Sequence, residues 1–176
     1  MIFTETSLPG AYVIDLERRG DDRGFFARTF CTDELAANGL SSDISQANVS
    51  VTRSAGTIRG MHYQEGEAAE DKIIRCVRGR ILDVFIDIRP GSPTFGRHEK
   101  VELDDETMRQ VYVPKGFAHG FLTLSDDCEV TYNVTHAYAP ERERGIRWND
   151  PRFAVEWPVE DPILSPKDAA LPDWTG

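Results

Sequence analysis

The sequence predicts an all-β protein whose chain closes into a jelly-roll barrel with short peripheral helices. Apolar and polar residues alternate in short runs through most of the chain, and Gly, Pro and Asp separate one run from the next. The length of 176 residues suits one domain, so residues 1–176 are interpreted as a single unit. Many short strands in one domain imply a sandwich or a barrel, and a jelly roll is the most economical closed form.

Strand-like runs follow one another closely through the middle of the chain. The expected strands, in chain order, are 46–52, 57–64, 72–77, 81–88, 98–103, 110–113, 120–124 and 130–135. Helical patterns occur in two places only. Residues 32–39 begin with a possible N-cap at Thr32 and end with Gly39, and residues 166–170 are long enough for one turn.

The run 81–88 has two different faces. One alternate set is wholly apolar and is expected to pack against another layer, whereas the other set carries Asp83 and Asp87. Asp87 is interpreted as a solvated strand residue. Because Arg78-Gly79-Arg80 joins this run to the preceding one, a tight hairpin is expected there. That hairpin would place Lys72 and Asp83 on neighbouring strands.

Composition excludes several classes of partner. A net charge of −10 argues against nucleic acid and against an anionic membrane, since both need a concentrated basic surface. No apolar run approaches the roughly 20 residues of a membrane helix, and no leader pattern is visible, which favours a cytoplasmic protein. Cys31, Cys76 and Cys128 are too scattered for a disulfide framework or a zinc site, and are interpreted as small buried residues.

Three segments place polar residues inside strand-like runs, where an apolar core would not need them. They are Arg59-Gly60-Met61-His62-Tyr63-Gln64, Pro114-Lys115-Gly116-Phe117-Ala118-His119-Gly120-Phe121 and Val130-Thr131-Tyr132-Asn133. In the second, Pro114-x-Gly116-x-x-His119 matches the second motif of the cupin superfamily. In that motif Pro and Gly turn the chain and the His points into the barrel.

Further segments complete a pattern that covers the chain from about Pro9 to Pro172. They are Asp22-Arg23-Gly24-Phe25-Phe26, Gln46-x-Asn48-x-Ser50, Asp83-Val84, Ser92-Pro93-Thr94-Phe95-Gly96, Trp148-Asn149-Asp150-Pro151 and Ser165-Pro166-Lys167-Asp168. In their order, these segments resemble the dTDP-4-dehydrorhamnose 3,5-epimerase family. The resemblance implies a cupin-type jelly roll, a homodimer that exchanges strands or arms, a nucleoside-diphosphate 4-keto-6-deoxyhexose as substrate, and neither metal nor cofactor.

The reaction implied by the resemblance is inversion at C3, C5 or both, beside the sugar ketone. Such a carbon can lose its proton because the charge spreads onto the carbonyl oxygen, so a base, an opposing acid and a cation at the oxygen are needed. The resemblance makes His62 the base, oriented by Asp168, with Tyr132 as the acid and Lys72 as the cation. The substrate contacts that it implies are Arg23, Phe26, Arg28, Gln46, Asn48, Arg59, Asp83, His119 and Tyr138. Among these, Arg23 and Arg59 are the expected diphosphate contacts, because a guanidinium fork suits phosphate oxygens.

Alternatives stay open on the sequence alone. His62 and His119 could be structural histidines, and Tyr132 could be a core aromatic residue. A metal-dependent cupin usually has two histidines one residue apart, but Tyr63 and Gln64 follow His62, so this pair is absent. A non-catalytic protein that binds nucleotide sugars is the other alternative.

Two positions depart from the family pattern. Arg28 stands where the family often has glutamate near the nucleotide base. Since a guanidinium favours acceptor-rich base edges, a nucleotide other than thymidine stays open. Asn133 stands where the family often has lysine after the tyrosine. Single and double epimerisation both remain compatible with this set of residues.

Overall fold

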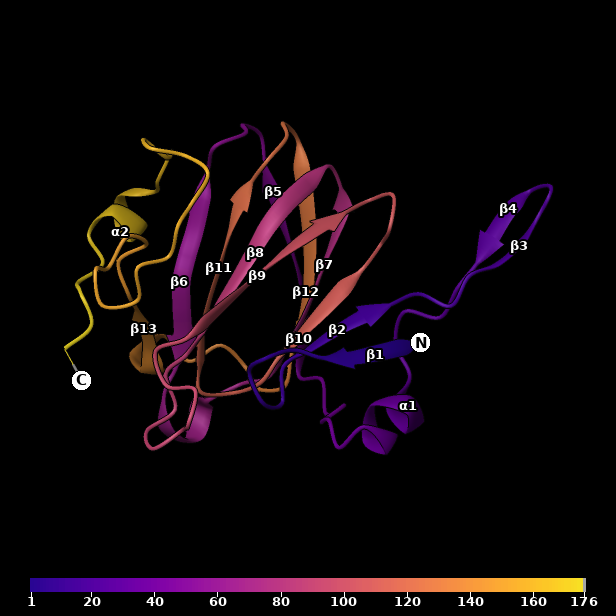
Figure 1. The fold of residues 1–176 in the computed structure, drawn as a ribbon, viewed down its shortest axis with the longest axis horizontal. Helices are drawn as coiled ribbons and strands as arrows, with labels where there is room; N and C mark the ends of the chain where they lie inside the picture. Colours follow the sequence, from indigo (N-terminus) through magenta and orange to yellow (C-terminus); the bar gives the residue numbers. More distant parts are fainter. Residues whose placement is uncertain (176) are drawn as a thin grey trace.

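Residues 1–175, the part of the chain that the computed structural model describes, form two antiparallel sheets that face each other (Figure 1). The six-stranded sheet has the order β1 (Ile2–Glu5), β2 (Tyr12–Asp15), β10 (Gln110–Val113), β7 (Lys72–Arg78), β12 (Cys128–Val134) and β5 (Gln46–Thr52). The five-stranded sheet has the order β13 (Glu143–Gly145), β6 (Ile58–Gln64), β11 (Phe117–Thr123), β8 (Arg80–Asp87) and β9 (His98–Asp104). The all-β prediction is confirmed.

The remaining elements are short. They are the hairpin β3 (Arg19–Asp21) and β4 (Gly24–Phe26), the helices α1 (Thr32–Ala37) and α2 (Pro166–Ala169), and the single 3₁₀ turns η1 (Gly66–Ala68) and η2 (Pro140–Arg142). Every strand predicted from the sequence is present, although β11 begins before the expected residue 120. Strands β1 to β4 and β13 were not predicted, since runs of three or four residues give only a weak alternation signal.

The predicted hairpin between β7 and β8 is wrong. β7 pairs with β10 and β12, whereas β8 pairs with β9 and β11 in the opposite sheet. The chain crosses from one sheet to the other at Gly79, whose φ of +78° is left-handed. A Cβ there would also lie 2.6 Å from Ser125 Oγ. A sharp turn with Gly therefore serves a jelly-roll crossover as well as a hairpin, and Lys72 and Asp83 end on facing sheets.

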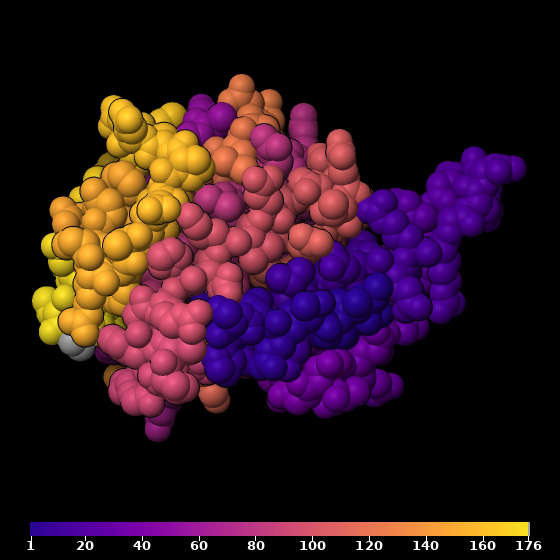
Figure 2. Space-filling view, in the orientation of Figure 1, coloured from indigo at the N-terminus to yellow at the C-terminus, as the bar shows by residue number. Residues whose placement is uncertain are grey.

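Two apolar layers explain the pattern of β8. Its set with Ile81 and Phe85 lies in the core between the sheets. Its other set, with Val84 and Ile86, faces outward and is covered by the C-terminal part of the chain, including Phe153. Figure 2 shows these C-terminal residues, in yellow, spread over one side of the molecule. Both faces of β8 are therefore buried, and the face with the two acids is the inner one.

Asp87 corrects the expectation of a solvated strand residue. Its carboxylate is fully buried and accepts hydrogen bonds of 2.6–3.0 Å from Arg89, Ser92 and Thr94. Burial alone would raise the pKa of Asp87, but these donors together hold it well below its usual range. The segment from Ser92 to Gly96 therefore forms a loop that satisfies a buried charge.

The N-terminal hairpin stands apart from the two sheets. Figure 1 shows β3 and β4 projecting from the body on the side opposite α2. Phe25 and Phe26 on this hairpin are 44% and 68% exposed, although large apolar side chains are usually covered. No helix among residues 1–175 is long and apolar enough to cross a membrane. Cys76 and Cys128 are buried as expected, whereas Cys31 is partly exposed.

Candidate active site

A cavity of about 500 Å³ lies between the two sheets, within the usual range for small-molecule sites. Both sheets and the C-terminal helix contribute to its wall. Its lining residues are Gln46, Asn48, Ser50, Arg59, His62, Tyr63, Gln64, Glu70, Lys72, Ile74, His119, Phe121, Val130, Tyr132, Val134, Tyr138, Glu143 and Asp168. The cavity thus brings together all four residues that the resemblance made catalytic.

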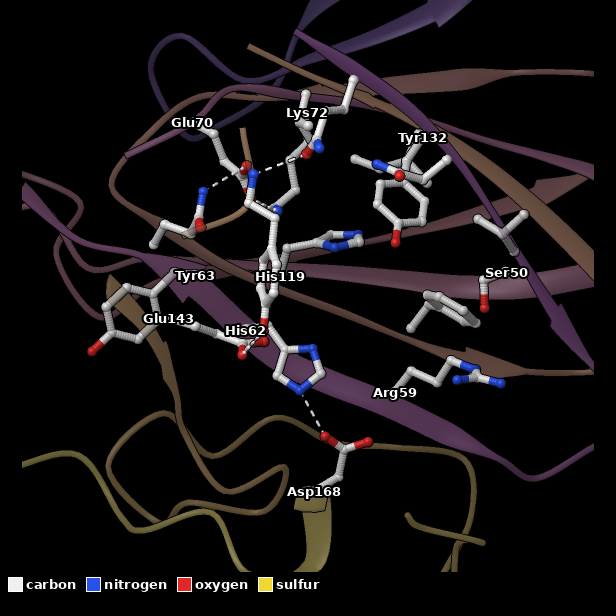
Figure 3. A pocket seen from close by; sticks show the side chains of 18 residues that line it. Ser50, Arg59, His62, Tyr63, Glu70, Lys72, His119, Tyr132, Glu143 and Asp168 are labelled. Atoms are coloured by element: carbon white, nitrogen blue, oxygen red, sulfur yellow. Dashed lines mark hydrogen bonds and ion pairs between the residues drawn. The ribbon is translucent and has the colours of Figure 1, made fainter. Parts of the chain in front are cut away.

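His62 lies on β6 and is held from behind by Asp168 of α2. The distance from His62 Nε2 to Asp168 Oδ1 is 2.6 Å (Figure 3). When the ring is neutral, Nε2 donates to this carboxylate, which leaves Nδ1 as the nitrogen that can accept a proton. Burial would raise the pKa of Asp168, but the hydrogen bond and charge of His62, with a smaller contribution from the side chain of Ser165, outweigh it and lower the pKa. The carboxylate is therefore ionised at neutral pH.

Tyr132 lies on β12, in the sheet that faces His62. Figure 3 shows its hydroxyl and the His62 ring pointing into the same space. Burial, with the carboxylate of Glu70 as the next contribution, raises the pKa of Tyr132 above its ordinary value. The phenol is therefore protonated at neutral pH and can act as a proton donor.

Lys72 enters the cavity from β7 and contacts the carboxylate of Glu70. The two side chains are 12% and 9% exposed. Glu70 also accepts a hydrogen bond of 3.0 Å from Gln64 Nε2. The predicted hairpin would place Asp83 on the strand next to that of Lys72. That expectation is wrong, because β8 belongs to the opposite sheet and the acid that Lys72 contacts is Glu70.

His119 lies on β11 and pairs in register with His62 on β6. Its Nε2 lies 2.8 Å from Oδ2 of Asp83, which is fully buried behind it. The second oxygen, Oδ1 of Asp83, has no hydrogen-bond partner among the described residues. Asp83 therefore lies behind the cavity wall and orients His119, whereas His119 itself faces the cavity.

The mouth of the cavity carries a cation and a hydrogen-bonded cluster. Arg59 is exposed and is fixed on β5 by donating to Thr52 Oγ1 at 2.9 Å and to the Val51 carbonyl at 3.2 Å. Glu143 Oε2 accepts from the hydroxyl of Tyr138 and from Lys167 Nζ, both at 2.7 Å. Glu143 was not predicted from the sequence, because no motif surrounds it.

Three predicted substrate contacts lie away from this cavity. Arg23 and Phe26 belong to the projecting β3–β4 hairpin, and Arg28 donates to Glu34 at 2.7 Å. None of the three lines the cavity of its own chain. Their role as substrate contacts therefore stays a prediction, and it would need the cavity of a second chain.

The geometry suits acid–base chemistry on opposite faces of a bound ring. A proton acceptor lies on one sheet, a phenol lies on the facing sheet, and the ammonium of Lys72 lines the same cavity. No group of three or more His, Cys, Asp or Glu within residues 1–175 is placed to hold a metal ion.

Comparisons with known proteins agree on one family. The family model described as dTDP-4-dehydrorhamnose 3,5-epimerase matches residues 5–175. A protein of that name from Methanothermobacter thermautotrophicus is 44% identical over 169 residues, which are 94% of this chain and 90% of the relative.

Solved structures give the same result. The dTDP-4-dehydrorhamnose 3,5-epimerase of Bacillus anthracis, with TDP and PPi bound, has a TM-score of 0.95 and 41% identity, over 98% of this chain and 99% of that chain. The Legionella pneumophila enzyme in complex with dTDP-4-keto-L-rhamnose has a TM-score of 0.91 and 38% identity. The match covers 98% of this chain and 92% of that chain. A 3'-monoepimerase from Streptomyces bikiniensis in complex with dTDP-quinovose has a TM-score of 0.88 and 37% identity. The match covers 96% of this chain and 85% of that chain. The cupin-type jelly roll is thereby confirmed.

Proposed function

The chain belongs to the dTDP-4-dehydrorhamnose 3,5-epimerase family, and we propose that it inverts C3, C5 or both in a dTDP-linked 4-keto-6-deoxyhexose. It is an isomerase that works by proton exchange beside the 4-keto group. The observation that carries the proposal is the placement of His62 and Tyr132 on facing sheets of one cavity. A base and an acid on opposite sides of a ring are what inversion requires.

The proton transfers follow from the orientation of each group. Nδ1 of His62 takes the proton from the carbon, the C–H electron pair forms a C=C bond to the carbonyl carbon, and the π electron pair of the ketone moves to its oxygen to give an enolate. Asp168 accepts from Nε2 and stabilises the imidazolium that results. The Lys72 ammonium stabilises the enolate oxygen. Tyr132 then protonates the carbon from the other face, and both groups regain their starting protonation states by exchange with water.

The rest of the substrate is proposed to extend toward the mouth. Arg59 would bind the diphosphate, with Gln46, Asn48 and Tyr138 around the nucleoside and His119 beside the sugar. The titration of dTDP, GDP, CDP and UDP against the protein tests the base, and clear preference for dTDP would end the suggestion that Arg28 selects another base.

A homodimer is part of the proposal, with one domain in each chain. The projecting hairpin would reach the partner's cavity and bring Arg23, Phe26 and Arg28 to the substrate there. The exposed phenylalanines of this hairpin support such a role, because they lack a cover within their own chain. A cytoplasmic location stays a prediction.

Exchange with heavy water tests the function. Incubation with dTDP-4-keto-6-deoxyglucose in D₂O should introduce deuterium at C3, at C5 or at both, as read by NMR. His62→Ala and Tyr132→Phe should each slow this uptake by about 10²- to 10⁴-fold, the usual contribution of a general acid or base. His136→Ala is the matched control, since His136 lies outside the cavity.

Each outcome of this assay has a definite reading. Uptake at one carbon alone would assign single epimerisation, as in the Streptomyces bikiniensis relative. Absence of uptake by the unmodified protein at either carbon would overturn the proposal for this substrate. Unreduced uptake in His62→Ala would refute the assignment of the base.

A further inference from the structure

We infer that Glu70 is a positioning residue for this reaction, whose carboxylate holds the Lys72 ammonium where the enolate oxygen forms and places a negative charge in the cavity that the Tyr132 phenol also lines. The inference rests on the proposed function and deepens it. No motif in the sequence pointed to Glu70, and the contacts of the cavity wall carry the inference.

Glu70 is anchored on the backbone through Gln64. The side-chain oxygen of Gln64 accepts from the Ala139 N–H at 2.6 Å, which fixes the orientation of the amide. Its Nε2 must then face the acceptors, which are Glu70 Oε2 at 3.0 Å and the carbonyls of Ala68 at 3.1 Å and Ala137 at 3.3 Å. The Gln64 side chain is buried, so this arrangement is rigid. One oxygen of Glu70 is therefore held, and the other contacts Lys72.

Lys72 depends on this carboxylate. Within residues 1–175 its ammonium makes no ion pair or hydrogen bond other than that with Glu70. The adjacent Asp71 is turned away, because its carboxylate accepts from the Lys115 N–H at 2.9 Å. The Lys72 side chain is only 12% exposed, so its ammonium would be costly without a partner. Glu70 therefore makes a half-buried lysine possible at this point of the cavity.

The pair lies where chemistry is proposed and not in the apolar core. Both side chains line the cavity together with Tyr132, and Figure 3 shows Glu70 and Lys72 close to one another at one end of it. A salt bridge that only stabilised the fold would not need to line the cavity where the substrate is proposed to bind. An ammonium that is already held in place before the reaction does not have to move when negative charge develops on the ketone oxygen.

Glu70→Gln is the test, because it keeps the shape and removes the charge. A neutral amide next to Lys72 no longer fixes the ammonium, so kcat should fall by about 10- to 100-fold, the cost of a misplaced catalytic group. KM should change by less than about threefold, since the interaction acts mainly in the transition state. Glu67→Gln is the matched control, because Glu67 is exposed on η1 outside the cavity and should leave kcat unchanged.

The pH dependence of kcat distinguishes the proposed role of Glu70 from that of a purely structural salt bridge, whose loss would leave it unchanged. Burial and Glu70 raise the pKa of Tyr132, and the acid must be protonated to act, so activity is lost as pH rises through that pKa. Removal of the negative charge lowers this pKa. In Glu70→Gln the loss of kcat at high pH should therefore begin at a lower pH, so that the alkaline limb of the pH profile shifts. Tyrosinate absorbance, compared with and without Tyr132→Phe, should show the same shift without any turnover.

Glu70→Asp keeps the inference testable if Glu70→Gln does not fold. The shorter acid retains the charge but draws the ammonium back, so kcat should fall while the alkaline limb stays near that of the unmodified enzyme. Unchanged kcat in the folded variants, with an unmoved limb in Glu70→Gln, would overturn the inference. Absence of exchange in the unmodified enzyme would instead count against the proposed function, and the absorbance titration would still report on Glu70 and Tyr132.

Discussion

At the scale of single residues, the pair of His62 and Asp168 makes the sharpest prediction. Asp168→Asn keeps an acceptor for Nε2 but removes the charge that stabilises the imidazolium, so kcat should fall by about 10²- to 10⁴-fold. The effect should extend across neutral pH, because the pKa of Asp168 is below its usual value and the carboxylate is ionised there. Asp161→Asn, an exposed acid outside the cavity, is the control. Deuterium uptake near the unmodified rate in Asp168→Asn would show that the imidazole needs no charged partner.

Residues set within motifs could be predicted, whereas residues outside them could not. His62, Tyr132 and Asp168 stand in segments whose order is recognisable, and all three line the cavity. Glu70 belongs to the connection before β7 and has no pattern around it, so its contact with Lys72 depended on the folded backbone. The prediction that Asp87 is solvated was wrong, because alternation cannot distinguish a solvated carboxylate from one that is covered by the loop that follows.

At the scale of elements, the approach of β6 and β11 makes a prediction about stability. A Cβ on Gly60 would lie 2.6 Å from Gly120 Cα and 2.9 Å from the His119 carbonyl, and Gly60 has a φ of +129°. Gly60→Ala should therefore destabilise the protein by about 3 kcal/mol, through strain and separation of the strands. It should also reduce deuterium uptake, because His62 and His119 are paired in register on these strands.

Gly56→Ala supplies the control for this prediction. Gly56 also has a left-handed φ, of +76°, but a Cβ there meets nothing within 4 Å. Its cost should stay near 1 kcal/mol, the penalty of the backbone conformation alone. Urea unfolding midpoints of the two variants compare the effects directly. Equal destabilisation would mean that strand separation contributes nothing at Gly60.

The extent of the strands was predictable, but the sheet that each one joins was not. Period-two patterns reflect a half-buried strand, and they marked β5 to β12 correctly apart from their ends. They contain no information on which strands pair with each other. A hairpin turn was therefore predicted at Gly79, although the chain crosses there from one sheet to the other. Because of that crossover Asp83 lies on the facing sheet, and the acid that contacts Lys72 is Glu70.

At the scale of the whole molecule, the projecting hairpin divides the predicted site into two parts. His62, Tyr132, Lys72 and Asp168 share a cavity within one chain, while Arg23 and Phe26 extend away from it. The resemblance implied an exchange of arms, but a single sequence cannot place a residue relative to a second copy. Because the Arg23 side chain is 89% exposed, removing it should leave the fold and the cavity of its own chain unaltered.

Complementation between subunits tests the exchange of arms. If each cavity takes its hairpin from the partner, Arg23→Ala and His62→Ala homodimers are both impaired, yet a mixed dimer has one complete site, formed by the His62 of one chain and the Arg23 of the other. Unfolding and refolding an equal mixture should give mixed dimers as half of all dimers, and so restore about one quarter of the unmodified activity. If the hairpin serves its own chain, both sites of a mixed dimer stay defective and activity remains at the level of the separate variants. The measured recovery therefore decides whether the site is built by one chain or by two.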